Sequence, residues 1–186
     1  MKIRVKFYRA EHDGHLIDDV ISGYTKIFNW NTEPYSHCGI WWPDADGRFL
    51  NEGSDGVGLF FTGFAGVCFS STMRGDANGT VIRPARDVLT HPERWDYCEI
   101  EVPDEKALEA MAWAQVEALN NKGYDKLQIL GFFFPWRFGR ADQNICTEAV
   151  GKFLYQALVL DRIWVWSPRR LSAKLIEKGY KIVPLI

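Results

Sequence analysis

The sequence lacks the features that would place it in several common functional classes. Its longest nearly apolar run, residues 129–136, is too short to cross a bilayer and contains a proline. The first fifteen residues hold no apolar segment typical of a secretory signal. A net charge of -2 offers no excess of positive charge for nucleic acid or an anionic membrane. We therefore expect a cytoplasmic protein with no transmembrane segment and no nucleic-acid partner.

Cysteine and histidine are both scarce, with four residues of each type. The cysteines at positions 38, 68, 98 and 146 show no Cys-x-x-Cys spacing, which argues against a zinc site and against a disulfide framework. The pair His12 and His15 lacks a third ligand of the usual kind. The sequence thus predicts free thiols, no metal and no cofactor.

What the sequence does contain is material for one globular domain. Its 186 residues are 47% hydrophobic, with eight Trp and twelve Phe, which is enough for a substantial core. Alternating polar and apolar residues predict strands over 2–7 and 96–102, and a further strand is expected over 35–42, ended by Pro43. Helical spacing predicts a helix from Asp104 to about residue 121 and a last helix opened by Ser167-Pro168. The expected core face of the first of these helices is Leu108, Met111, Ala112, Val116 and Leu119. These elements make an α+β domain spanning residues 1–186.

The stretch 141–148 predicts a loop that runs into a helix with a cysteine in its first turn. Asn144 is a good N-cap residue. Behind it an apolar face repeats at helical spacing, comprising Ala149, Val150, Phe153, Leu154, Ala157 and Leu158. At a helix start, the dipole and the free N–H groups favour a negative charge and lower the pKa of a thiol. Cys146 is therefore the candidate nucleophile.

A thiol nucleophile needs a base, and His37 on the predicted strand 35–42 is the best candidate. A Cys–His pair supports nucleophilic catalysis, because the imidazole accepts the thiol proton and returns it to the leaving group. Strand alternation places His37, Gly39 and Trp41 on one face and Cys38 on the other. We therefore expect Cys38 to point away from His37, and its replacement by Ala to preserve activity. Gly39 leaves room for another group to approach.

A third polar residue usually orients such an imidazole. Residues 48–52 are expected to return antiparallel to the strand of His37, after the turn at Asp46-Gly47. Glu52 and Asn51 both lie there, on opposite faces, so only one of them can serve. Glu52 is preferred because a carboxylate also stabilises the imidazolium, and Asn51 is the alternative.

Several motifs, taken in order, resemble one family. They are Tyr-Ser-His-Cys-Gly-Ile at 35–40, then Glu52 with a Gly-Val turn, Gly-Tyr-Asp-Lys-Leu-Gln-Ile-Leu at 123–130, Asn-Ile-Cys-Thr-Glu-Ala-Val at 144–150, and Ser167-Pro168 with Leu171. This order is similar to that of the circularly permuted NlpC-like, papain-like hydrolases of the YaeF/YiiX group, over residues 3–171. The family more often has an aliphatic residue at the position of Cys38.

The resemblance implies a papain-like domain in which an antiparallel sheet carrying His37 packs against the helix that starts with Cys146. It implies a cysteine hydrolase that cleaves amide bonds, with esters as a second class, in small peptide or acyl-amide substrates such as peptidoglycan peptides. A phage or prophage origin, with delivery to the cell wall by other proteins, is compatible with the lack of an export signal. The alternatives are an acyltransferase or lipid amidase, whose acyl groove the aromatic residues 132–138 would line, and a non-catalytic binding or assembly protein. The oligomeric state stays open.

Overall fold

The computed structural model describes residues 1–9, 35–44, 64–73, 77–120, 123–125, 144–163 and 167–186. Within these residues a six-stranded sheet runs in the order β4-β3-β2-β1-β5-β6, and every pair of neighbours is antiparallel. The strands are β1 (Lys2–Arg9), β2 (Tyr35–Trp42), β3 (Val67–Thr72), β4 (Gly79–Pro84), β5 (Trp95–Glu101) and β6 (Ile182–Pro184). The α+β class and the antiparallel sheet are confirmed.

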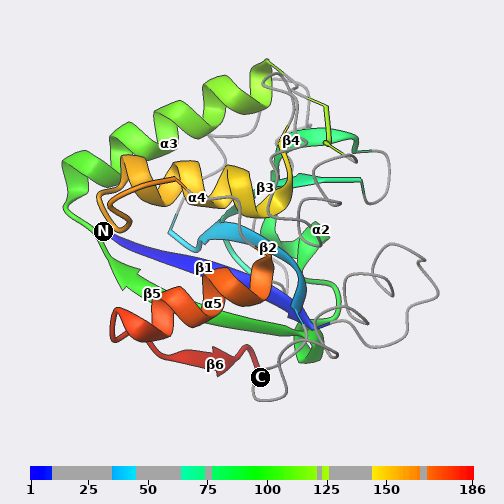
Figure 1. The fold of residues 1–186 in the computed structure, drawn as a ribbon. Helices are drawn as coiled ribbons and strands as arrows, with labels where there is room; N and C mark the ends of the chain where they lie inside the picture. Colours follow the sequence, from blue (N-terminus) through cyan, green and yellow to red (C-terminus); the bar gives the residue numbers. More distant parts are fainter. Residues whose placement is uncertain (10–34, 45–63, 74–76, 121–122, 126–143, 164–166) are drawn as a thin grey trace.

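Three helices build the larger core on one face of the sheet. They are α3 (Asp104–Leu119), α4 (Cys146–Gln156) and α5 (Pro168–Glu177). Helix α4 packs on β2 and β3, α5 packs on β2, and α3 contacts both α4 and β4 (Figure 1). Five of the six apolar residues expected on the buried face of α4 are buried, and Leu158 is exposed because the chain turns there with a positive φ. Helix α5 begins as predicted, with Ser167 accepting from the Arg170 N–H.

The prediction of which α3 residues face the core was wrong for most of its large apolar residues. Leu108, Val116 and Leu119 are exposed, and Met111 alone of the large expected residues is buried. The buried face is instead lined by small residues, with Ala107, Ala110 and Ala114 fully enclosed. Small side chains let the helix axis approach α4 closely, and an alanine face gives only a weak periodic signal in the sequence.

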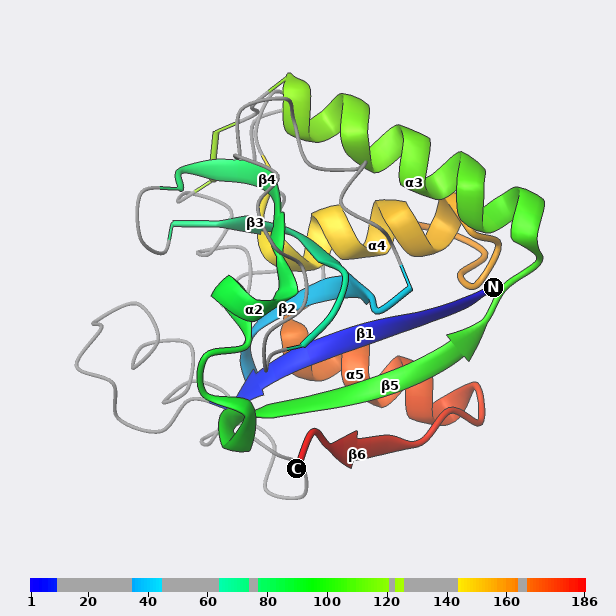
Figure 2. The same cartoon turned by 180° about the vertical axis from the view of Figure 1, so that it is seen from behind.

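The opposite face of the sheet carries a smaller core, to which α2 (Ala85–Val88) contributes Ala85 (Figure 2). The 3-10 turn η2 (Pro92–Arg94) leads into β5 and buries none of its own residues. The buried apolar members of this smaller core are Tyr8, Trp41, Cys68, Ala85, Leu89 and Trp95.

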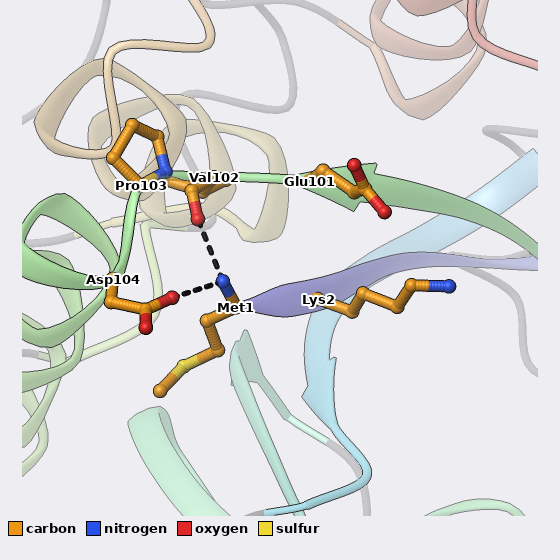
Figure 3. Close-up of a pocket in the computed structure, with 6 residues that line it drawn as sticks. All are labelled: Met1, Lys2, Glu101, Val102, Pro103 and Asp104. Carbon is orange, nitrogen blue, oxygen red and sulfur yellow. Dashed lines mark hydrogen bonds and ion pairs between the residues drawn. The ribbon is translucent and has the colours of Figure 1, made fainter.

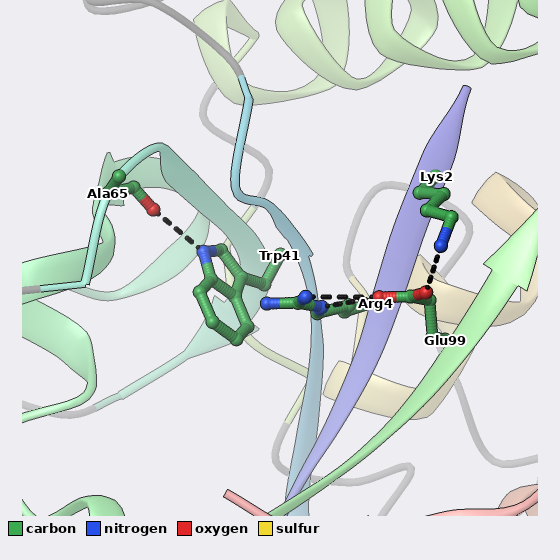
Figure 4. Close-up of polar contacts among 5 residues, drawn as sticks. All are labelled: Lys2, Arg4, Trp41, Ala65 and Glu99. Atoms are coloured by element: carbon green, nitrogen blue, oxygen red, sulfur yellow. Dashed lines mark hydrogen bonds and ion pairs between the residues drawn. The ribbon is translucent and has the colours of Figure 1, made fainter.

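An arginine bridges the strands on this face. The Arg4 guanidinium lies 4.6 Å from the Trp41 ring centroid and 5.0 Å from that of Tyr97, and its Nε donates to Glu99 (Figure 4). The Trp41 indole N–H donates to the Ala65 carbonyl at 2.9 Å. Because these contacts join β1, β2 and β5 to the segment before β3, they fix the spacing of the strands that carry the candidate site.

An irregularity interrupts the pairing of β1 with β2 near the start of β2. Tyr8 lies opposite His37, but the next residue, Arg9, lies opposite Tyr35. Ser36 is therefore an extra residue on β2, and the strand has a β-bulge there. As a result Tyr35 joins the larger core with Cys38, while His37 remains on the other face. Bulges of this kind re-aim neighbouring side chains.

Candidate functional site

Helix α4 begins at Cys146, with Ile145 as its N-cap in an extended conformation and no side-chain cap. Asn144 was expected to be the cap and is not. The N-cap side chain thus gives no acceptor to the first N–H groups of the helix, and the positive end of the helix dipole acts on Cys146 as its first residue. Cys146 itself is buried, with 2% of its surface exposed.

Asn144 instead anchors the chain just before the helix. Its fully buried amide donates to Thr80 on β4 and to Glu117 on α3, and its side-chain oxygen accepts from Lys152 at 2.6 Å. Its backbone carbonyl accepts from the Ser71 hydroxyl at 2.7 Å. Two strands and two helices thus meet at one residue, and this network fixes where α4 starts.

Cys146, at the start of α4, is affected by two residues of β2. The His37 ring and Cys38, both on β2, act on the Cys146 thiol and lower its pKa. Helix α4 packs on both β2 and β3, and the pairing of these two strands covers Ile40 to Trp42.

His37 is enclosed by the smaller core. Only 7% of its surface is exposed, and its ring lies 6.3 Å from the Trp95 ring in an edge-to-face arrangement at 74°. Gly39, two residues further along the same face, has the Phe69 carbonyl 2.9 Å and the Lys6 side chain 3.0 Å from where a Cβ would lie. The expectation that Gly39 admits a close neighbour is confirmed. These contacts hold the strand that presents the imidazole.

The four thiols of the chain differ sharply in acidity. Hydrogen bonds from the Cys38 thiol, the His37 ring and the Cys38 N–H hold the pKa of Cys146 well below its usual range, against the opposing effect of burial. Burial, and then donation to Cys146, raises the pKa of Cys38 well above its usual range. Burial raises the pKa of Cys68 to about 11 and that of Cys98 to about 12. Of the four thiols, Cys146 is therefore the one whose surroundings favour the thiolate.

Sequence reasoning placed Cys38 on the face opposite His37, and that face is confirmed. It did not foresee that Cys38 lowers the pKa of Cys146, because alternation along one strand says nothing of groups that approach from another element. All four cysteines are free thiols, as expected. Cys98 and Cys68 are buried in the two cores, as small hydrophobic residues commonly are.

Glu52 and Asn51 lie outside the described residues, so the orienting role of Glu52 stays a prediction. In the described part of the sheet, the strands on either side of β2 are β1 and β3.

Among the described residues no cluster of three metal-ligating side chains occurs. None of the described helices is long and apolar enough to span a membrane.

A surface pocket lies at the far end of the sheet, where β1 begins and β5 ends (Figure 3). It is lined by Met1, Lys2, Glu101, Val102, Pro103 and Asp104. Lys2 and Tyr8 lie six positions apart on β1, which is about 20 Å of strand. Since this pocket has neither a thiol nor an imidazole, the Cys–His pair at the other end of β1 is the stronger candidate.

Comparisons with known protein families, with curated proteins and with solved structures found no match.

Proposed function

We propose that this chain is a cysteine hydrolase of the permuted NlpC-like, papain-like kind, with Cys146 as nucleophile and His37 as base. The observation that carries the proposal is Cys146 as the first residue of helix α4, with a thiol pKa that Cys38 and the His37 ring lower. A lowered thiol pKa at such a position supports a nucleophilic role, because the thiolate is the reactive form.

The arrangement suits acyl transfer to sulfur. The Cys146 thiolate attacks the carbonyl carbon of an amide, and the oxyanion forms beside the free N–H groups that open α4. Protonated His37 then gives its proton to the leaving nitrogen, which leaves a thioester on the sulfur. Water, deprotonated by His37, hydrolyses the thioester and restores the thiolate. The same steps act on esters, with oxygen as the leaving atom.

The substrates proposed are small peptides or acyl amides, with peptidoglycan peptides as the leading class. This choice rests on the family resemblance of the motifs at 35–40 and 144–150. The test is release of new amines from peptidoglycan peptides by the purified chain, followed by mass spectrometry. Simple acyl amides and acyl esters form a parallel panel that separates peptidase from lipid amidase or acyl transfer.

Substitutions at Cys146 and His37 test whether these two residues carry out the hydrolysis. Cys146→Ala and His37→Ala are each expected to abolish hydrolysis while the circular dichroism spectrum and the unfolding transition persist. Cys98→Ala is the matched control, because it removes an equally buried thiol that does not touch the site. Hydrolysis that survives Cys146→Ala would refute the proposal. Absence of turnover on the whole panel, with slow and equal alkylation of all four cysteines, would favour a binding protein instead.

A further inference from the structure

Lys6 lies inside the sheet domain, although lysine side chains are almost never fully enclosed. It belongs to β1, and 1% of its surface is exposed. The pairing of β1 with β2 sets it opposite Gly39, and its Cε lies 3.0 Å from where a Gly39 Cβ would be. Its ammonium lies 4.1 Å from the ring centroid of Trp95. The hydrolytic steps described above make no use of this buried charge.

The candidate base shares the aromatic neighbour of Lys6. The His37 ring centroid lies 6.3 Å from that of Trp95. Tyr8 is opposite His37, and Lys6 precedes Tyr8 by two residues, so Lys6 and His37 are diagonal neighbours on one face of the β1–β2 pair. Diagonal neighbours in an antiparallel pair lie about 7–8 Å apart. A buried ammonium and the imidazole therefore share one face of the sheet.

We propose that Lys6 is a positioning residue of the candidate site, whose ammonium opposes the charge of protonated His37 and makes the imidazolium a stronger proton donor. The inference rests on the proposed role of His37 as the acid and base of hydrolysis. It adds the residue that sets the strength of that acid.

The surroundings of Lys6 favour its charged form. Burial alone favours a neutral amine, because an ammonium loses its hydration. The face of a tryptophan ring is the best aromatic partner for a cation, and the attraction is strongest where water is excluded. Trp95 is itself buried and packs edge-on against Tyr8, with 5.0 Å between the ring centroids, so its ring is held in place beside the ammonium.

The elements around this face carry other titratable groups, namely Arg4 and Tyr8 on β1, Cys68 on β3, Arg83 on β4, Arg86 and Asp87 on α2, Arg94 on η2, Tyr97 and Glu99 on β5, and Cys146 on α4. Arg4 is paired with Glu99 at 3.0 Å. Burial raises the pKa of Cys68 to about 11, so this thiol is neutral near pH 7. Lys6 differs from these cations in sharing an aromatic neighbour with His37.

The test follows the ring protons of His37 by NMR as a function of pH, in the full chain carrying Cys146→Ala. This background removes a thiol whose titration would be coupled to that of the imidazole. The signal is identified by its loss in His37→Ala.

Adding Lys6→Met keeps a long apolar side chain and removes the charge. It should raise the pKa of His37 by about 1–1.5 units, the effect of one charge at about 8 Å and an effective dielectric constant of about 20. The sign holds whatever else Lys6 contacts, since the two chains differ by one positive charge. The matched control is Lys2→Met, which removes a 55% exposed side chain from the same face of β1 and should leave the pKa unchanged. An unchanged pKa in folded Lys6→Met would overturn the proposal.

A second measurement needs no substitution at Lys6. In the wild-type chain labelled with carbon-13 lysine, the Cε protons of Lys6 are identified by the upfield shift that the Trp95 ring imposes. They should report an ammonium at pH 7 and change again at the midpoint of the His37 titration. A neutral amine, or a signal that does not respond to His37, contradicts the proposal even if Lys6→Met fails to fold.

Turnover separates this inference from the proposed function. In chains that keep Cys146, Lys6→Met should move the alkaline limb of kcat/KM to higher pH by the same amount, because the imidazolium then holds its proton longer. If the pKa of His37 stays fixed while Cys146→Ala and His37→Ala abolish hydrolysis, the role of Lys6 is refuted and the proposed function stands. If the pKa rises but no substrate of the panel is hydrolysed, the charge effect of Lys6 is supported and the proposed function fails.

Discussion

Replacing Cys38 by Ala should make Cys146 less acidic, contrary to the tolerance that strand alternation predicts. A hydrogen bond to a charged group is worth about 1.5–3 kcal/mol, and a thiol is a weak donor, so the lower end applies. Since about 1.4 kcal/mol corresponds to one pKa unit, the pKa of Cys146 should rise by about one unit. The backbone N–H of residue 38 and the His37 ring keep their contacts, so the pKa stays below that of an ordinary thiol.

The assay is the rate of iodoacetamide labelling at Cys146 as a function of pH. At a pH below the midpoint, Cys38→Ala should label about tenfold more slowly than the wild type, because one pKa unit is a factor of ten in thiolate. Cys38→Ser supplies a hydroxyl donor and should restore the wild-type profile. Cys98→Ala controls for the loss of a buried sulfur. If Cys38→Ala and the wild type give the same midpoint while both remain folded, the argument that Cys38 stabilises the thiolate is wrong.

Three further changes test other parts of the site. Gly39→Ala should destabilise the fold by about 1–3 kcal/mol, measured by urea unfolding, because its Cβ would lie 2.9 Å from the Phe69 carbonyl; an unchanged midpoint would show that the strands separate without cost. Glu52→Gln should raise the pH of rapid alkylation and lower turnover while Asn51→Ala does little, and the reverse result would assign the orienting role to Asn51. Asn144→Ala should cost about 2–4 kcal/mol in unfolding free energy and slow alkylation of Cys146, since it removes the side-chain hydrogen bonds to Thr80, Glu117 and Lys152; normal alkylation would show that other contacts hold the helix start.

Sequence patterns predicted a strand or helix correctly where large apolar side chains recur every two residues, as in a strand, or every 3.6 residues, as in a helix. The buried face of α4 is an example, because its large apolar residues at helical spacing pack against the core. The strand 35–42 is buried on both faces. Helix α3 shows the limit. Its buried face is alanine, and the larger Leu108 and Val116 lie on the exposed side, so the strongest apolar signal marks the wrong face.

The candidate site shows a different limit. Cys146 and His37 were proposed from helix-start chemistry and strand position, and their catalytic roles stay a prediction. The effect of Cys38 on the pKa of Cys146 depends on the docking of α4 on β2, which leaves no periodic signal in the sequence. The anchoring role of Asn144 likewise depends on partners from β3, β4 and α3 that only the assembled fold supplies.

The central position of β1 has a consequence for the order in which the strands can pair while the chain is being synthesised. This strand is made before the other five, yet it lies between β2 and β5, and its second neighbour is made only when residues 95–101 have emerged. The helix that starts with Cys146 follows later still. Because the contacts that lower the pKa of that sulfur join segments far apart in the sequence, a growing chain carries only ordinary thiols. The lowered pKa of Cys146 therefore arises only once the sheet and α4 have assembled.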